Sequence, residues 1–173
     1  MLCCVLAWVP AAAQEAPTEY QVKAAFLFNF VKFIEWPADS FHDNGGHMRL
    51  CVLGDERFGR ELERIAAGKV VDGHALEVIR IGPGERARGC HVLFVASSQA
   101  GTVHETLAQV RGAPVLTVGD SPEFIRQGGI IRFFLLDNRV RFEISRAAAE
   151  QCGLKISSKL LALGQSSGRA GGG

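Results

Sequence analysis

The sequence predicts a single α/β domain: a mostly parallel sheet flanked by helices, with a C-terminal antiparallel hairpin at its edge. Two patterns lead to this prediction. Apolar runs typical of buried strands alternate with helical patterns from residue 49 to residue 120. Two later strand patterns then flank Asp137-Asn138, a pair typical of a tight two-residue turn. The 173 residues are enough for one domain with a substantial core.

The first thirteen residues have the character of an export signal. They form an apolar run that closes on Ala11-Ala12-Ala13, the small-residue pattern of a signal-peptidase site. A buried N-terminal strand is the alternative interpretation. We expect residues 1–13 to be a signal peptide that is removed, and residues 19–163 to form the domain. Residues 164–173 are rich in glycine and serine and predict a flexible tail.

The segment from Lys23 to Pro37 predicts a helix that is largely buried. Aromatic and aliphatic residues recur along it at helical spacing, and Thr18 is suited to cap its start. Proline disfavours helical backbone in the residue before it, so the helix is expected to end at Trp36. The apolar run is short and interrupted by charges, which excludes a membrane-spanning helix.

The same helix carries candidate partner-binding residues on its other face. At 100° per residue, Asn29, Lys32 and Glu35 form a polar stripe, on which Phe28 and Trp36 also fall. Large aromatic side chains beside a charge are typical anchors of protein interfaces. Burial beneath a neighbouring segment is the simpler alternative. Phe28, Lys32 and Trp36 are therefore expected either to bind a partner or to belong to the core.

The remaining elements follow from periodicity and from turn residues. We expect strands at residues 49–55, 76–81, 91–96, 114–120, 130–136 and 139–144. We expect helices at residues 58–67, 103–110, 123–126, 146–152 and 156–163.

The last predicted strand has a charged face. Arg139, Arg141 and Glu143 alternate with apolar residues, so these three side chains point the same way. The pattern predicts a surface ion pair between Arg141 and Glu143, or a protein interface if this edge of the sheet is covered.

Composition and motifs argue against several classes of function. The net charge is +1 with no basic run, which argues against binding to nucleic acid or to an anionic membrane. The five histidines are scattered without metal-ligand spacing, so no metal site is expected. No catalytic constellation is recognisable, and we expect neither an enzyme nor a cofactor. A hydrolase using Ser98 or Ser157 is the remaining catalytic alternative.

A small-molecule site is an alternative to a protein-binding role. Open parallel sheets bind ligands in a crevice beyond the C-terminal ends of their strands. Asp55, Ser97, Ser98 and Asp120 directly follow predicted strands and would line such a crevice. The alternative function is therefore that of a small-molecule sensor or binding protein.

The chain resembles the YfiR-like family of bacterial periplasmic proteins over about residues 19 to 163. The matching motifs occur in the expected order: Val22–Pro37, Leu50–Asp55, Gly89–Val95, Val115–Asp120, Gly128–Ile130, Arg141–Ile144 and Gly153–Leu161. The resemblance implies a periplasmic repressor that binds the periplasmic part of an inner-membrane diguanylate cyclase. It would lower cyclic di-GMP signalling and biofilm formation, and an outer-membrane lipoprotein could sequester it. A homodimer remains open.

Three cysteines lie outside the expected signal peptide. An odd number of cysteines in an exported protein implies one disulfide and one free thiol. Cys51 lies near the start of one predicted strand, and Cys90 immediately precedes another. If these strands are parallel neighbours, the two thiols lie within bridging distance. The resemblance independently implies the pair Cys51–Cys90, which leaves Cys152 free; three reduced cysteines are the alternative.

Overall fold

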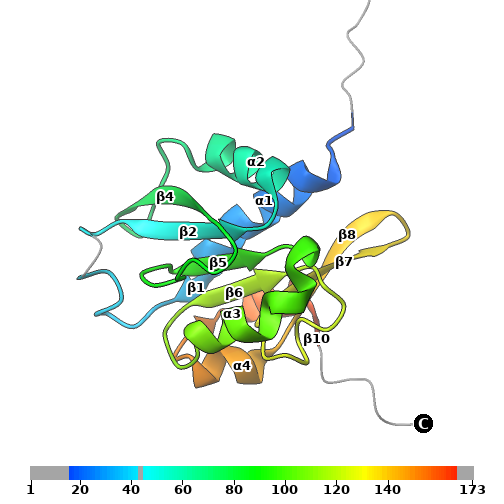
Figure 1. Cartoon of the computed structure of the whole chain (residues 1–173). Helices are drawn as coiled ribbons and strands as arrows, with labels where there is room; N and C mark the ends of the chain where they lie inside the picture. The colour runs from blue at the N-terminus through cyan, green and yellow to red at the C-terminus, as the bar shows by residue number, and fades with distance from the viewer. Residues whose placement is uncertain (1–15, 43–44, 167–173) are drawn as a thin grey trace, which may run out of the picture.

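The computed structural model describes residues 16–42 and 45–166 as one α/β domain (Figure 1), and it confirms the predicted fold class. The helices are α1 (Glu19–Phe30), α2 (Glu56–Ala66), α3 (Val103–Gln109), α4 (Arg146–Gln151) and α5 (Ser158–Leu163), with short 3-10 helices η1 (Val31–Phe33) and η3 (Ser97–Thr102). The strands are β1 (Ile34–Glu35), β2 (Met48–Leu53), β3 (Val70–Val71), β4 (His74–Ile81), β5 (Val92–Val95), β6 (Leu116–Gly119), β7 (Ile131–Leu136), β8 (Arg139–Ile144), β9 (Lys155–Ile156) and β10 (Gln165–Ser166).

The main sheet has the strand order β10-β8-β7-β6-β5-β2-β4-β3. Strands β4, β2, β5, β6 and β7 run parallel, as the alternating pattern predicts. Strand β8 pairs antiparallel with β7 through the turn at Asp137 and Asn138, whose φ angles are 49° and 56°. Left-handed backbone at both positions defines the expected type of tight turn.

Helices α1 and α2 pack together on one face of the sheet; in the view of Figure 1, α1 runs behind β2 and β5 and α2 lies above α1. Thr18 caps α1 as predicted, because its side chain accepts the Gln21 N–H while the Gln21 side chain accepts the Thr18 N–H. An aromatic cluster joins α1 to the hairpin: the Phe30 ring lies 4.8 Å from Phe142 and 5.6 Å from Phe133. This face holds the larger core.

The predicted extension of α1 to Trp36 is wrong. The helix ends at Phe30, tightens into η1 and then becomes strand β1, which pairs antiparallel with β9. The carbonyl of Phe33 accepts the Ser157 N–H at 2.9 Å, and Ile34 lies opposite Ile156. Backbone groups that would continue the helix therefore bond to a segment more than a hundred residues away.

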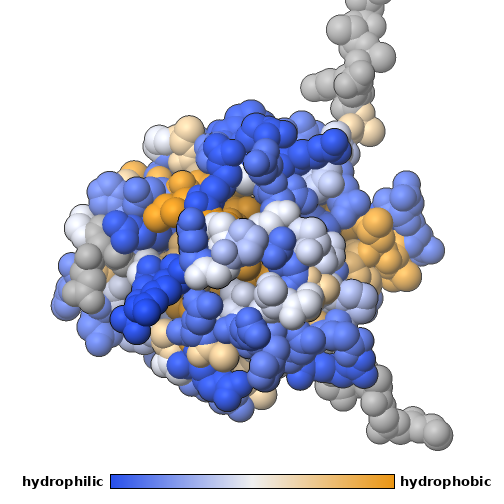
Figure 2. Space-filling model, in the orientation of Figure 1, coloured by the Kyte–Doolittle hydropathy of each residue, from blue (hydrophilic) through white to orange (hydrophobic). Residues whose placement is uncertain are grey.

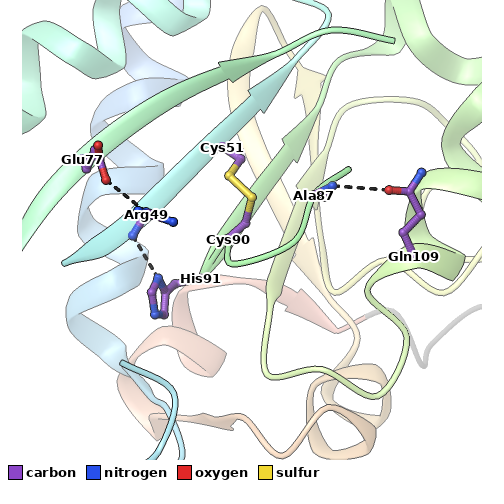
Figure 3. The surroundings of a disulfide bond; sticks show 7 residues. All are labelled: Arg49, Cys51, Glu77, Ala87, Cys90, His91 and Gln109. Carbon is purple, nitrogen blue, oxygen red and sulfur yellow. Dashed lines mark hydrogen bonds and ion pairs between the residues drawn. A yellow bond between two sulfur atoms is a disulfide. The ribbon is translucent and has the colours of Figure 1, made fainter. Parts of the chain in front are cut away.

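The opposite face is covered by α3 and by the loop of residues 82–91, which crosses β2 between β4 and β5. Parallel strands of one sheet are usually connected by a helix, and here an extended loop makes the crossing. A disulfide between Cys51 on β2 and Cys90 at the end of the loop ties the two together, with Cα atoms 5.9 Å apart (Figure 3). The predicted pairing is confirmed, and Cys152 is free.

Three other predicted segments differ in the structure. Residues 123–126 form turns rather than a helix, and the last helix begins at Ser158 because Lys155–Ile156 form β9. Gln165–Ser166, expected in a flexible tail, form β10 and pair with Glu143 and Ile144. The predicted signal peptide and residues 167–173 lie outside the described residues.

Candidate functional site

The residues predicted to line a ligand crevice at the C-terminal edge of the sheet bond instead to other groups of this chain. The hydroxyl of Ser98 donates to the carbonyl of Gly54 at 2.8 Å, which bridges the ends of β2 and β5. The carboxylate of Asp120 accepts the Ser97 N–H at 2.5 Å and the Lys23 ammonium at 2.7 Å. The structure thus brings Ser97 and Asp120 together, but as partners of each other.

Asp55 lies apart from these groups and has a capping role. Its carboxylate accepts the Phe58 N–H at 2.9 Å at the start of α2. A groove of about 490 Å³ beside it runs between the ends of β2 and β4, with Arg80 and Pro83 on its far wall. Neither predicted serine lines this groove, so the four residues of the predicted crevice do not form one site.

Lys23 is a buried charge inside the apolar run of α1. Its side chain on α1 bonds to Asp120 and, at 2.5 Å, to Glu19. Burial by itself lowers the pKa of Lys23, but the hydrogen bonds and charges of Asp120 and Glu19 outweigh it, and the pKa is raised above 10.5. The sequence signal for this buried lysine is its position one helical turn before Leu27, inside the buried stripe of the helix.

Two of the three residues predicted to bind a partner from the first helix, Phe28 and Lys32, lie side by side in the structure. The ammonium of Lys32 lies 4.0 Å from the centre of the Phe28 ring and donates to Asn29 at 2.9 Å. Asn29 also lines a shallow, mostly apolar groove of about 270 Å³ along α1, together with Val22 and Phe26. Phe28, which is half-buried, and the exposed Lys32 therefore lie together at the surface.

Trp36 does not share that surface, because α1 ends before it. It follows β1, is half-buried, and packs edge-on against Phe41 with ring centres 6.2 Å apart. Phe41 is in turn stacked between the rings of His74 and His91, at 3.7 and 4.5 Å. Trp36 thus belongs to an aromatic cluster at the N-terminal edge of the sheet.

His91 fastens this cluster to the sheet. Its Nδ1 accepts the Arg49 N–H at 2.9 Å (Figure 3). Its Nε2 lies 2.9 Å from the Ser40 carbonyl, so a neutral ring bonded at both nitrogens fits the site. Burial, together with the charges of His74 and Arg49, lowers the pKa of His91 below 6.5, although the Ser40 bond opposes the shift. The sequence signal for this role of His91 is its position at the start of an apolar strand.

The β7–β8 hairpin extends beyond the helices and exposes apolar side chains at its tip (Figures 1 and 2). Leu135 and Leu136 are 51% and 46% exposed, and Arg139 and Arg141 on the facing strand are exposed as well. The predicted ion pair between Arg141 and Glu143 is wrong, because Glu143 pairs with Arg132 on β7. Glu143 is thus engaged within the hairpin.

The two predicted partner-binding groups lie on different faces of the sheet. Along β8, Val140 and Phe142 face α1, and Phe142 contacts Phe26 with ring centres 5.5 Å apart. Arg139, Arg141 and Glu143 alternate with these residues and therefore point away from α1.

The free thiol of Cys152 lines a cavity of about 380 Å³ between α3 and α4, next to Gly112. Burial raises the pKa of this thiol, partly offset by a hydrogen bond with the Gly112 backbone. Within residues 16–42 and 45–166, no group of three or more histidine, cysteine or acidic side chains is arranged to hold a metal ion. None of the described helices is long and apolar enough to cross a membrane.

These features define a class: an α/β domain with a largely parallel sheet, a disulfide-anchored crossover loop and a projecting hairpin. The sequence model of the YfiR/HmsC-like family matches residues 20–165, and the chain belongs to that family. A search of curated proteins gave no match.

The fold is similar to a solved structure described as a conserved domain protein from Vibrio cholerae O1 biovar El Tor str. N16961. The TM-score is 0.57 at 12% sequence identity, with 86% of this chain and 60% of that chain covered. The chain thus spans about 60% of that protein's length. At this identity the similarity supports the fold and nothing further.

Proposed function

We propose that this protein is a periplasmic regulatory binding protein that represses an inner-membrane diguanylate cyclase and so lowers cyclic di-GMP and biofilm formation. Membership of the YfiR/HmsC-like family is the observation that carries the proposal. The role is one of binding rather than of catalysis. Repression requires a surface for the cyclase, and an outer-membrane lipoprotein would compete for this protein.

The hairpin supports a binding role on physical grounds. Leu135 and Leu136 are exposed side by side with Arg139 and Arg141, and protein interfaces commonly combine apolar anchors with arginine. The α1 surface offers a second contact area, in which Phe28 and Lys32 are held together by a cation–π contact.

The proposal is tested by measuring cyclic di-GMP in cells of the native organism that lack the gene. We expect the level to rise on deletion and to return when the full chain is supplied. A chain without residues 1–13 is the matched control, since it would stay in the cytoplasm and fail to restore repression. An unchanged cyclic di-GMP level on both deletion and overproduction would contradict the proposed function.

A further inference from the structure

The outer edge of β8 is only partly covered. Strand β10 pairs with β8 at Glu143 and Ile144, and nothing in the described part of the chain pairs with the outer side of Arg139–Arg141. An uncovered strand edge presents backbone N–H and C=O groups that can accept another strand. The open stretch adjoins the exposed tip of the hairpin, where Leu135 and Leu136 lie.

The register of the hairpin determines which backbone groups face outward. In a two-residue hairpin the residues that flank the turn, here Leu136 and Arg139, form a hydrogen-bonded pair. Such pairs alternate along an antiparallel ladder, so Arg139 and Arg141 direct their backbone groups toward β7. Val140 therefore directs its N–H and C=O outward, toward the open edge.

A second copy of this chain does not fit this edge. When two copies of β8 pair antiparallel along it, residues with outward backbone groups must lie opposite each other. The available registers then place Arg141 opposite either Arg141 or Arg139 of the second copy. Like charges directly opposite on a sheet are destabilising, so the edge disfavours self-association.

The side chains favour an acidic partner. Arg139 and Arg141 are both exposed, and neither has an ion-pair partner among residues 16–42 and 45–166, whereas Glu143 is engaged by Arg132. Carboxylates on an added strand would lie opposite the two arginines. Its intervening side chains would lie on the other face, beside Val140 and Phe142.

We propose that the edge Arg139–Arg141 binds an extended segment of a partner protein by strand addition, and that this segment alternates acidic and apolar residues. The inference deepens the proposed function and rests on it, with the periplasmic segment of the cyclase as the source of the strand. Backbone hydrogen bonds at Val140 provide affinity, and the arginine pair selects the acidic sequence.

The binding test uses the full mature chain and a fluorescent peptide of alternating glutamate and valine. We expect binding that weakens with salt, and roughly a tenfold or greater loss in the double variant Arg139→Glu, Arg141→Glu. A lysine–valine peptide should bind that variant better than it binds the wild type. The matched control is Arg86→Glu with Arg88→Glu, which reverses two exposed arginines of the crossover loop and should bind normally.

A peptide N-methylated at its valines removes backbone donors while keeping the side chains, and we expect it not to bind. Equal binding of the methylated peptide, or unchanged binding by the arginine double variant, would overturn strand addition. The same double variant in cells separates the two proposals. If deletion of the gene raises cyclic di-GMP but the double variant represses normally, the edge assignment is wrong and the regulatory function stands.

Discussion

The two faces of the sheet are stabilised in different ways. On the first face α1 and α2 bury large side chains, and the Phe30 ring stacks on Phe133 and meets Phe142 edge-on across the helix–hairpin contact. On the second face a crossover loop takes the place usually filled by a helix, and the Cys51–Cys90 disulfide fastens it to β2. A covalent bond thus holds the crossover loop against the sheet at the place where side-chain packing would hold a crossover helix.

The largest expected loss of stability comes from removing the disulfide on the second face. Replacing both Cys51 and Cys90 with alanine should lower the free energy of unfolding by about 4 kcal/mol, because the disulfide closes a loop with a sequence separation of 39. Urea unfolding followed by circular dichroism measures the change. Cys152→Ala is the matched control with a much smaller effect. Equal stability of the double variant and the wild type would show that loop packing suffices without the bond.

The next effect concerns the first face, where Lys23 ties α1 to the end of β6. Lys23→Met should destabilise the fold by about 3 kcal/mol, because it leaves the partly buried Asp120 without its cation. Exposed Lys32→Met should change stability by no more than roughly 0.5 kcal/mol.

The pH dependence of Lys23 has a defined sign. Since the folded-state pKa is raised, the stabilisation by this ion pair is complete below 10.5 and is lost as pH rises through the folded-state pKa. Urea unfolding at a series of alkaline pH values should reveal this loss in the wild type and its absence in Lys23→Met. An identical alkaline loss in both proteins would contradict the assignment.

A smaller effect is expected at Gly129 on the second face. A Cβ at this position would collide with the Phe124 ring and with the Phe124 carbonyl. Gly129→Ala should therefore cost about 2 kcal/mol through overpacking. Gly101→Ala, where a Cβ meets no neighbour, is the control and should be close to neutral. Thermal unfolding compares the two, and equal melting temperatures would mean that Phe124 can move freely.

The smallest effect lies at the N-terminal edge, where His91 holds Ser40 and Phe41 against the sheet. The pKa of His91 is lowered in the folded protein, so below about pH 6.5 the unfolded chain takes up a proton that the folded ring resists. Stability should fall as pH decreases through this range. Proton NMR should give a His91 titration midpoint below 6.5, and a midpoint above that value would contradict the buried, doubly bonded ring.

Features with a local signal could be predicted from the sequence. The Thr18 cap, the Asp137-Asn138 turn and the alternation of strands each depend on neighbouring residues, and the disulfide required only that β2 and β5 be adjacent.

Features that depend on distant pairing could not be predicted. Ile34–Glu35 forms a strand only because Lys155–Ile156 lies beside it, so the periodicity of α1 gave no warning that the helix ends at Phe30. The separation of Trp36 from Phe28 and Lys32 follows from the same pairing. Likewise, Glu143 bonds to Arg132 across the hairpin, a partner that the pattern along one strand does not reveal.

Binding of the regulatory partner at the outer edge of β8, as proposed, should be visible by amide hydrogen exchange measured with and without the periplasmic segment of a diguanylate cyclase from the same cell. We expect exchange at the outward-facing amides of Val140 and Phe142 to slow when the segment is added, while α2 is unchanged. Binding of the segment with unchanged exchange in β8 would contradict this assignment.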